Sequence, residues 1–252
     1  MTLQRRVCAE TLDNLPVQDP AAMRSRRDLR RVHRAMGSRG IVLRGLDDKL
    51  RAARGARPLR VLELGAGDGS LMLGVARKSG LAWPAVDLTL LDRQPLVDRG
   101  TLQAYTELGW TAAVQTLDVF DWAASAAQVP AAGGTQARWD LVVANLFLHH
   151  FEGRQLALLL AAIVASTDCF FACEPRRAWL ALAGSHLTGL IGANAVTRND
   201  AVLSVHAGFT GHELTALWPS AGAPWKLTEY PAGLFSHCFR AERLGVAGAK
   251  AV

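Results

Sequence analysis

Apolar and polar positions follow one another along residues 58–175 in a way that predicts short strands separated by helices. Apolar runs of strand length, each ended by a polar or glycine-rich turn, occupy residues 59–64, 86–91, 112–117, 139–146 and 169–174. Helix-like segments lie between them at residues 69–79, 95–108 and 152–165, and a polar Ala/Gly-rich loop is expected near 125–138. Strands that alternate with helices are typical of a parallel sheet covered on both faces. The pattern therefore predicts an α/β fold.

The pattern ahead of residue 58 predicts two helices. In the segment AAMRSRRDLRRVHRAMG the apolar positions fall near one face at helical spacing, and Gly37 is a natural stop. Ser38 can cap a second amphipathic helix, which Gly55 would close. We expect residues 1–57 to form a helical arm or lid, and residues 58–252 to form the main domain.

The rhythm loosens after Glu174. We expect a helix over residues 176–190, a turn-rich stretch over 194–209 and a helix over 211–218. Two further strands are predicted at 225–230 and 235–242, with a Pro-Ala-Gly turn between them. This pair can form an antiparallel hairpin at the edge of the sheet.

Composition supports one sizeable core: half of the 252 residues are hydrophobic. No run of about 18 apolar residues is present, and early acids at Glu10, Asp13 and Asp19 argue against a signal peptide, so a cytoplasmic location is expected. The four cysteines lack paired C-x-x-C spacing. We interpret them as reduced core thiols.

Positive charge is concentrated in the arm. Residues 24–60 contain thirteen basic side chains and three acidic ones, a balance of +10 against +6 for the whole chain, so the remainder carries −4. Such a segment can bind nucleic acid or an anionic substrate, or can be the solvated face of two amphipathic helices. No aromatic residue interrupts the arginines as a base-stacking platform would require, which favours the solvated face.

The first strand ends in a glycine-rich turn, VLELGAGDGS. Gly65, Gly67 and Gly69 permit a tight turn and a close approach of a ligand to the backbone. The dinucleotide fingerprint would place its third glycine at position 70, where Ser70 stands, and no Gly-Lys-Ser/Thr of a P-loop follows. Glu63 and Asp68 add negative charge. The turn therefore suits a cationic or zwitterionic ligand better than a pyrophosphate.

Carboxylates also mark the next two strand ends. Asp92 follows the second strand, where an acidic side chain can accept hydrogen bonds from both ribose hydroxyls. Asp118 follows the third, where it can accept one from an adenine amino group, while Val119 and Phe120 offer apolar contact with the ring. Ligands of open parallel sheets bind at these carboxyl ends. Together the carboxylates predict a site for a positively charged nucleoside.

The ordered set ELGAGDG, LLDRQ, LDVFDW and WDLVVANLFLHHF resembles the class I S-adenosylmethionine-dependent methyltransferases over residues 58–175. The resemblance implies a Rossmann-like seven-stranded, mostly parallel sheet with an antiparallel last strand. It also implies S-adenosylmethionine as cofactor and S-adenosylhomocysteine as product. The positions that would bind the cofactor are Glu63, Gly65, Ala66, Gly67, Asp92, Arg93, Asp118, Val119, Asn145 and Leu146.

Two outer segments, DLRRVHRAMG and TRNDAVLSVHAGFTGHEL, are similar to those of bacterial small-molecule methyltransferases of polyketide and quinone-type pathways. That similarity implies an N-terminal lid with Arg31 and Met36 near the cofactor. It also implies that residues 176–210 shape the acceptor pocket. Asp200, His206 and Arg176 are candidate acceptor contacts, although a helix cap or a helix start is the favoured explanation for such residues.

His149 and His150 end the fourth strand, where an acceptor would enter. Methyl transfer to a hydroxyl needs an acceptor held near the methyl carbon and a group that removes its proton, and histidine suits that task near neutral pH. The alternative is that one of them caps the following helix or forms a hydrogen bond with the loop. We expect no metal site, because neighbours on an extended chain point apart and no third ligand motif is nearby.

Asn145 is followed by Leu-Phe-Leu rather than by the Pro-Pro-aromatic sequence of methyltransferases that act on planar nitrogens. We therefore expect methylation of oxygen or carbon on a small aromatic or polyketide-like acceptor, with no membrane or nucleic-acid partner. Two alternatives stay open. One is an RNA methyltransferase that uses the basic arm, and the other is a non-catalytic nucleoside binder or a nicotinamide-type oxidoreductase.

Overall fold

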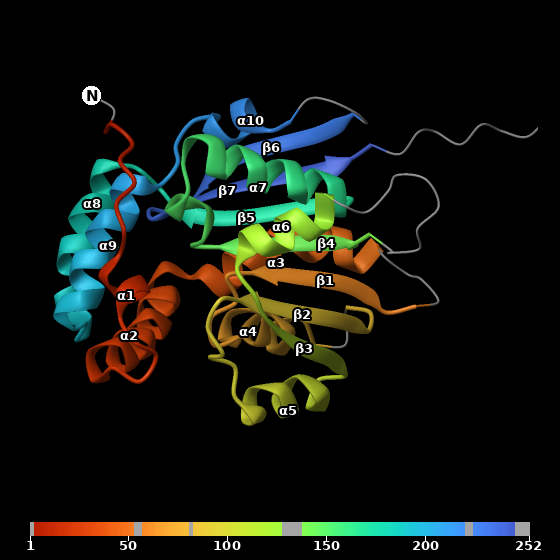
Figure 1. Ribbon diagram of the computed structural model, residues 1–252, viewed down its shortest axis with the longest axis horizontal. Coiled ribbons are helices and arrows are strands. Elements are labelled where there is room, and N and C mark those ends of the chain that lie inside the picture. Colours follow the sequence, from red (N-terminus) through yellow and green to blue (C-terminus); the bar gives the residue numbers. More distant parts are fainter. Residues whose placement is uncertain (1–2, 53–56, 81–82, 128–137, 220–223, 245–252) are drawn as a thin grey trace, which may run out of the picture.

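The computed structural model describes residues 3–52, 57–80, 83–127, 138–219 and 224–244, and a seven-stranded sheet forms its centre (Figure 1). The sheet has the order β3-β2-β1-β4-β5-β7-β6. Its strands are β1 (Leu59–Leu64), β2 (Val86–Asp92), β3 (Trp110–Thr116), β4 (Leu141–Asn145), β5 (Cys169–Pro175), β6 (Trp225–Ala232) and β7 (Ser236–Arg243). Strands β1 to β5 pair in parallel, and β7 pairs antiparallel with both β5 and β6. The predicted Rossmann-like sheet with an antiparallel last strand is confirmed.

Helices cover both faces of the sheet. In β4 the side chain of Val143 packs into one hydrophobic cluster and that of Val142 into the other, as the two-residue period of a strand requires. The first cluster is covered by α3 (Ser38–Ala52), α4 (Ser70–Ser79) and α5 (Arg99–Glu107). The second is covered by α6 (Val119–Ala127), α7 (Gly153–Ser166) and α10 (Glu213–Leu217). Figure 1 shows α6 and α7 in front of the sheet and α3 and α4 behind it.

The remaining helices gather at the carboxyl ends of the parallel strands, at the left of Figure 1. We call this group the cap; it consists of α1 (Thr11–Asn14), α2 (Pro20–Met36), α8 (Trp179–His186), the 3-10 helix η3 (Leu187–Ile191) and α9 (Ala195–Ala207). Buried polar contacts join its two halves: the hydroxyls of Ser25 and Thr197 lie 2.8 Å apart, and Asp28 accepts the backbone N–H of Asn194 at 2.7 Å. The cap therefore unites segments far apart in the sequence.

Helix α2 begins and ends where the sequence predicts, and α3 begins at Ser38. The prediction that Ser38 caps this helix was wrong, because its hydroxyl is buried with no hydrogen-bond partner among the described residues. Asp19 caps α2 by accepting the N–H groups of Ala21 and Ala22, and Gly37 ends it in the left-handed conformation, at φ 69°. The prediction that Gly55 closes the second helix lies outside the described residues. Helix α3, which the sequence grouped with the arm, packs into the sheet core through Ile41, Val42 and Leu46.

The structure departs from four local predictions. The turn-rich stretch expected at residues 194–209 is helix α9, which Asn194 caps by accepting the N–H of Thr197. The helix expected over 176–190 is divided into α8 and η3. Helix α6 was not predicted, and residues 128–137 of the loop expected beside it lie outside the described residues. Cys8 is exposed rather than in the core, whereas the other three cysteines are buried thiols that form no disulfide.

The described residues contain no helix that is both long and apolar enough to cross a membrane.

Helix α3 lies directly on β5 because Gly45 has no side chain. A Cβ built at this position would lie 2.3 Å from an atom of the Phe171 ring, which is fully buried in the sheet. In contrast, a Cβ at Gly40 of the same helix would meet the guanidinium of Arg44 at 3.4 Å, an ordinary contact with a flexible side chain. A side chain at Gly45 would therefore clash with the sheet, whereas the space around Gly40 admits a methyl group.

We expect Gly45→Ala to lower the free energy of unfolding by about 1–3 kcal/mol, because the methyl group forces α3 away from the sheet. Gly40→Ala is the matched control. It should be neutral or raise the free energy of unfolding by up to about 1 kcal/mol, the gain in helix propensity. Urea titration of the two variants measures both values, and equal effects would contradict the close-packing argument.

Candidate functional site

A cavity of about 520 Å³ lies at the carboxyl ends of the parallel strands, between the sheet and the N-terminal part of the cap. Its walls include every residue that the sequence assigns to the central cofactor site, namely Glu63, Gly65, Ala66, Gly67, Asp92, Arg93, Asp118, Val119, Asn145 and Leu146. His149 and His150 also line it. The structure thus brings the motifs of four strands together around one space.

The glycine turn after β1 is shaped by backbone conformations that favour glycine. Gly65 and Gly67 have φ values of 67° and 56°. A Cβ at Gly65 would lie 2.3 Å from the ring of Phe147, so a side chain there would displace that ring. The N–H of Gly67 donates to one oxygen of Asp92 at 2.8 Å, and the N–H of Gln94 donates to the other at 2.9 Å. Asp92 therefore holds the turn in place while it faces the cavity.

Two buried acceptor atoms in this part of the cavity have no donor among the described residues. One is Oε2 of Glu63, at the end of β1, and the other is Oδ1 of Asn145, at the end of β4. Burial, together with the nearby charges of Asp68 and Asp92, raises the pKa of Glu63 well above its usual value. An unpaired buried acceptor costs free energy, so this corner of the cavity is complementary to a ligand that donates hydrogen bonds.

Asp118 and Val119 also line the cavity. Asp118 accepts the N–H of Phe120 at 2.8 Å at the start of α6, and Val119 is buried in the core beneath that helix. The ring of Phe120 meets that of Phe151 edge to face, with centroids 5.3 Å apart. This side of the cavity therefore combines one carboxylate with apolar and aromatic surface.

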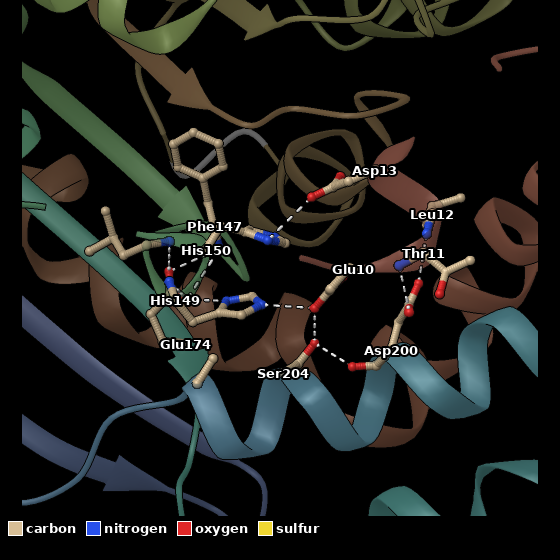
Figure 2. A network of polar contacts seen from close by, with 12 residues as sticks. Glu10, Thr11, Leu12, Asp13, Phe147, His149, His150, Glu174, Asp200 and Ser204 are labelled. Carbon is tan, nitrogen blue, oxygen red and sulfur yellow. Dashed lines mark hydrogen bonds and ion pairs between the residues drawn. The ribbon is translucent and has the colours of Figure 1, made fainter. Parts of the chain in front are cut away.

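The chain turns sharply where β4 ends. Leu146 has a positive φ of 50°, the only one among the described non-glycine residues, and such strain is common at functional sites. The turn leaves three successive N–H groups, of Phe147, Leu148 and His149, pointing at the fully buried carboxylate of Glu174 at the end of β5. Figure 2 shows these bonds converging on one side chain.

His149 lies between two carboxylates. Its Nδ1–H donates to Oε2 of Glu174 at 2.8 Å, and its Nε2 faces Oε1 of Glu10 at 3.4 Å (Figure 2). Burial by itself lowers the pKa of this imidazole, but the hydrogen bonds to Glu10 and Glu174 outweigh burial and raise it to about 9. Burial opposes ionisation of Glu10 too, yet its bond with His149 lowers the pKa of Glu10 below the usual value. At neutral pH His149 is therefore a buried cation.

His150 has the opposite character. Burial, and then the positive charge of His149, lower its pKa below the usual value. Its Nδ1 lies 3.4 Å from Oδ2 of Asp13, and its side chain is partly exposed, whereas His149 is almost fully buried. The adjacent histidines therefore differ in charge: His150 is the neutral one at pH 7.

The geometric reason given against metal binding was wrong. Residues 148–150 form a 3-10 turn, η2 (Leu148–His150), rather than an extended chain, and the two imidazole rings lie 4.3 Å apart at a tilt of 32°. Glu10, His149 and His150 each place a ligand-type atom within 4.8 Å of the others. His149 and Glu10, however, already bond to each other. The expectation of no metal stays a prediction.

The N-terminal strap, residues 3–14, closes this side of the cavity. Asp200 in α9 accepts the N–H groups of Thr11 and Leu12, each at 2.9 Å, and the hydroxyl of Ser204 donates to Glu10 (Figure 2). Asp13 pairs with Arg93 at 3.2 Å. Sequence reasoning missed Glu10, Asp13, Glu174 and Ser204 as site residues. No local pattern marks them, because their partners lie far away in the sequence.

Five further residues singled out from the sequence lie away from the cavity wall. Helix α2 presents Arg26, Leu29, Arg30 and His33 to the cavity, at helical spacing. Arg31 and Met36 fall on other faces, and Arg31 pairs with Asp28 at 2.6 Å. Asp200 binds the strap, Arg176 donates to the carbonyl of Gly233 at 3.4 Å, and the carbonyl of His206 accepts the N–H of Arg6 at 3.0 Å.

Solved methyltransferases share this fold. One is the plantazolicin methyltransferase BpumL in complex with SAH, 12% identical with a TM-score of 0.58, where the match covers 90% of this chain and 92% of that one. Another is the magnesium protoporphyrin IX methyltransferase ChlM from Synechocystis PCC 6803 with bound SAH, at 14% identity, a TM-score of 0.50 and coverage of 92% and 91%. An O-methyltransferase family protein from Burkholderia thailandensis, at 16% identity and a TM-score of 0.50, is covered over 68% of its length by 92% of this chain.

No protein-family model and no curated protein matches the sequence. At such identities the structural likeness establishes the fold. It is the fold of class I S-adenosylmethionine-dependent methyltransferases, as the sequence predicted.

The raised pKa of His149 makes stability depend on pH. A group whose pKa is higher in the folded state stabilises the protein fully below its unfolded value, about 6.5, and loses that contribution as pH rises towards 9. We expect the free energy of unfolding to fall by on the order of 3 kcal/mol over this range. Glu10→Gln should remove much of this dependence, because the neutral amide no longer favours the imidazolium.

Thermal unfolding at a series of pH values between 6.5 and 9 measures the effect. Asp13→Asn is the control, since Asp13 faces His150, whose pKa is lowered in the folded state and which therefore adds no stability that is lost as pH rises. A Glu10→Gln protein with the pH profile of the wild type would contradict the ion pair.

Proposed function

We propose that the protein is an S-adenosylmethionine-dependent methyltransferase that acts on oxygen, or on carbon, of a small acceptor. The observation that carries the proposal is the pair of unpaired buried acceptors, Glu63 Oε2 and Asn145 Oδ1, beside the glycine turn. A ligand that brings both donors and positive charge satisfies them. The ammonium and sulfonium groups of S-adenosylmethionine have these properties.

The other residues of the cavity fit the same ligand. The glycine turn leaves room for an amino-acid group beside the backbone. Each oxygen of Asp92 accepts one N–H bond and keeps a second lone pair, so the carboxylate can still accept two ribose hydroxyls. Asp118 and Val119 would take the adenine. The volume of about 520 Å³ lies within the range of ligand cavities, roughly 300–1,000 Å³.

When bound, S-adenosylmethionine supplies a methyl group on a sulfonium, which an acceptor lone pair can attack directly. The residues of this chain then have two tasks, to hold the acceptor and to remove its proton. His150 suits the second, because it is neutral at pH 7 and lines the cavity. His149 can neither remove a proton from the acceptor nor donate one readily, since both of its ring N–H groups face carboxylates. It is a positioning residue that ties the strap to the end of β4.

The walls around His150 favour an aromatic acceptor. The rings of Phe147 and Phe151 meet edge to face, with centroids 5.2 Å apart, and both line the cavity. Aromatic edges and faces of this kind bind planar ligands well. The names of the plantazolicin and magnesium protoporphyrin IX methyltransferases refer to small acceptors, which supports a small-molecule acceptor for this chain as well.

Calorimetric titration with S-adenosylmethionine tests the cofactor assignment. Glu63→Gln should weaken binding by roughly tenfold, or about 1.4 kcal/mol, because the amide lacks the negative charge that attracts the cationic cofactor. The same substitution should raise the thermal midpoint of the free protein at neutral pH. The pKa of Glu63 is raised in the folded state, so the fold is penalised above the unfolded value of about 4.5, and glutamine removes the penalty.

Asp121→Asn, at an exposed carboxylate of α6 outside the cavity, is the control and should change neither quantity. A Glu63→Gln protein with unchanged affinity would remove Glu63 from the site. Tighter binding of NADH than of S-adenosylmethionine to the wild type would overturn the proposed function.

Turnover tests the role of His150. With tritiated S-adenosylmethionine and a panel of phenols and hydroxyquinones, His150→Ala should lower kcat by roughly a hundredfold or more, while cofactor affinity changes less than about twofold. Turnover of the wild type should persist below the usual histidine pKa of about 6.5, because the pKa of His150 is lowered, and should fall only at more acidic pH. Chelation of divalent metals should leave the rate unchanged. Wild-type turnover by the His150→Ala protein would show that another group removes the proton.

A further inference from the structure

The outer surface of the cap exposes an unusual number of large apolar side chains. Among the described residues, half of the large hydrophobic side chains that are exposed belong to one region: Trp179, Leu180, Leu187, Leu190, Ile191 and Leu234. Leu190 is 82% exposed and Leu180 is 65% exposed. These six residues form what we call the apolar ridge. Apolar groups gathered in this way commonly mark an interaction surface.

The ridge is one continuous face of α8 and η3. Leu180 and Leu187 are seven residues apart, which is two helical turns, and Leu187 and Leu190 are three apart, which superimposes them in a 3-10 helix. The opposite side of α8 is buried at Ala181 and Ser185. Leu234 joins from the β6–β7 turn, where the neighbouring Phe235 packs against Gly184 of α8.

Basic side chains border the ridge. Residues 176–199 contain three arginines and no Asp or Glu. Arg177 is buried and pairs with Glu213, whereas Arg176 is partly exposed and Arg198 is exposed. The side chain of Arg198 lies against Gly189 in η3, and Arg31 of α2 donates to the carbonyl of Ile191 at 3.0 Å. Arg176 bonds the β6–β7 turn beside Leu234. The ridge is therefore apolar along its crest and basic at its edges.

This charge pattern decides between the possible occupants. A second copy of the chain, packed ridge to ridge about a two-fold axis, would place the arginines of one copy against those of the other, which is unfavourable. A peptide or helix would need a groove, whereas exposures of this size belong to side chains that protrude from the surface. Protruding Leu and Trp flanked by Arg suit the boundary between acyl chains and anionic headgroups.

We propose that the apolar ridge docks the protein on the surface of an anionic phospholipid membrane. Leu180, Leu187 and Leu190 enter the headgroup region, and the arginines at the edges meet lipid phosphates. This is attachment to a surface and not passage through it, and it departs from the expectation, drawn from the sequence, of no membrane partner. The proposal does not depend on the proposed function, although docking would bring the cap, and with it the strap side of the cavity, close to the bilayer.

Vesicle flotation of the full chain tests the proposal. The wild type should bind vesicles of phosphatidylcholine mixed with phosphatidylglycerol at least about tenfold more tightly than vesicles of phosphatidylcholine alone, and high salt should weaken binding. The double variant Leu180→Ser/Leu190→Ser should lose binding by about tenfold or more. Arg198→Ser should weaken vesicle binding by about fivefold, which is the contribution of one basic side chain near an anionic surface.

Leu158→Ser is the matched control, because Leu158 is half exposed on α7, outside the ridge, and its loss should leave vesicle binding unchanged. Thermal midpoints show whether each variant is folded. Trp179 gives a second readout: vesicles should shift tryptophan emission of the wild type to the blue, and Trp179→Phe should remove most of that shift.

Three results would overturn the proposal. The first is the absence of vesicle binding by the folded wild type, and the second is equal binding to neutral and anionic vesicles. The third is a wild-type dimer in light scattering that Leu180→Ser/Leu190→Ser converts to a monomer, which would assign the ridge to a second copy. Cofactor binding to the double variant should match the wild type, so failure of docking and failure of the proposed function are distinguishable.

Discussion

The buried carboxylate of Glu174 is the group on which the geometry of the site depends. At the end of β4 the chain leaves the sheet through the strained conformation of Leu146, and three N–H groups lose their partners in the strand ladder. Glu174 accepts all three from the neighbouring strand, and a buried carboxylate is tolerated only when it is bonded in this way. It also fixes the ring of His149, which turns the imidazole towards Glu10. The attraction between the His149 imidazolium and the Glu10 carboxylate then holds the strap over the cavity.

The two ends of the cavity satisfy their polar groups differently. On the strap side each buried charge has a partner within the chain: His149 lies between Glu10 and Glu174, and Asp200 binds the backbone of the strap. On the side of the glycine turn, Glu63 and Asn145 keep acceptors that no described residue satisfies. Within the cavity wall, Glu63 and Asn145 are the described residues with a buried side-chain atom that lacks a hydrogen-bond partner, and an unpaired buried acceptor that faces a cavity marks a place for a ligand donor. The contacts on the strap side therefore stabilise the fold, whereas the acceptors beside the glycine turn are available to a ligand.

How well each element could be predicted follows from how local its signal is. The strands were predicted because alternation and apolar runs act over a few residues, and so were α2 and its stop at Gly37. Helix α9 was predicted as turns because its polar residues hide the face that it buries. Thr197 and Asp200 are buried, and they bond to Ser25 and to the strap, which lie far away in the sequence. Arg31 was expected near the cofactor, yet the position of α2 on the cap turns Arg26 and Arg30 to the cavity instead. Helical spacing predicts which side chains share one face of a helix, but not which face is turned towards the cavity.

The sequence by itself determined the sheet, the glycine turn and the carboxylates at successive strand ends, because each is encoded within a few neighbouring residues. Only the tertiary structure decided what the two histidines are. Glu10 lies 139 positions from His149 and 194 from Ser204. Contacts over such separations leave no periodicity, and burial and charge act on pKa only once the groups are brought together. Adjacent and identical in the sequence, His149 and His150 become a paired cation and a neutral imidazole because the fold surrounds them differently.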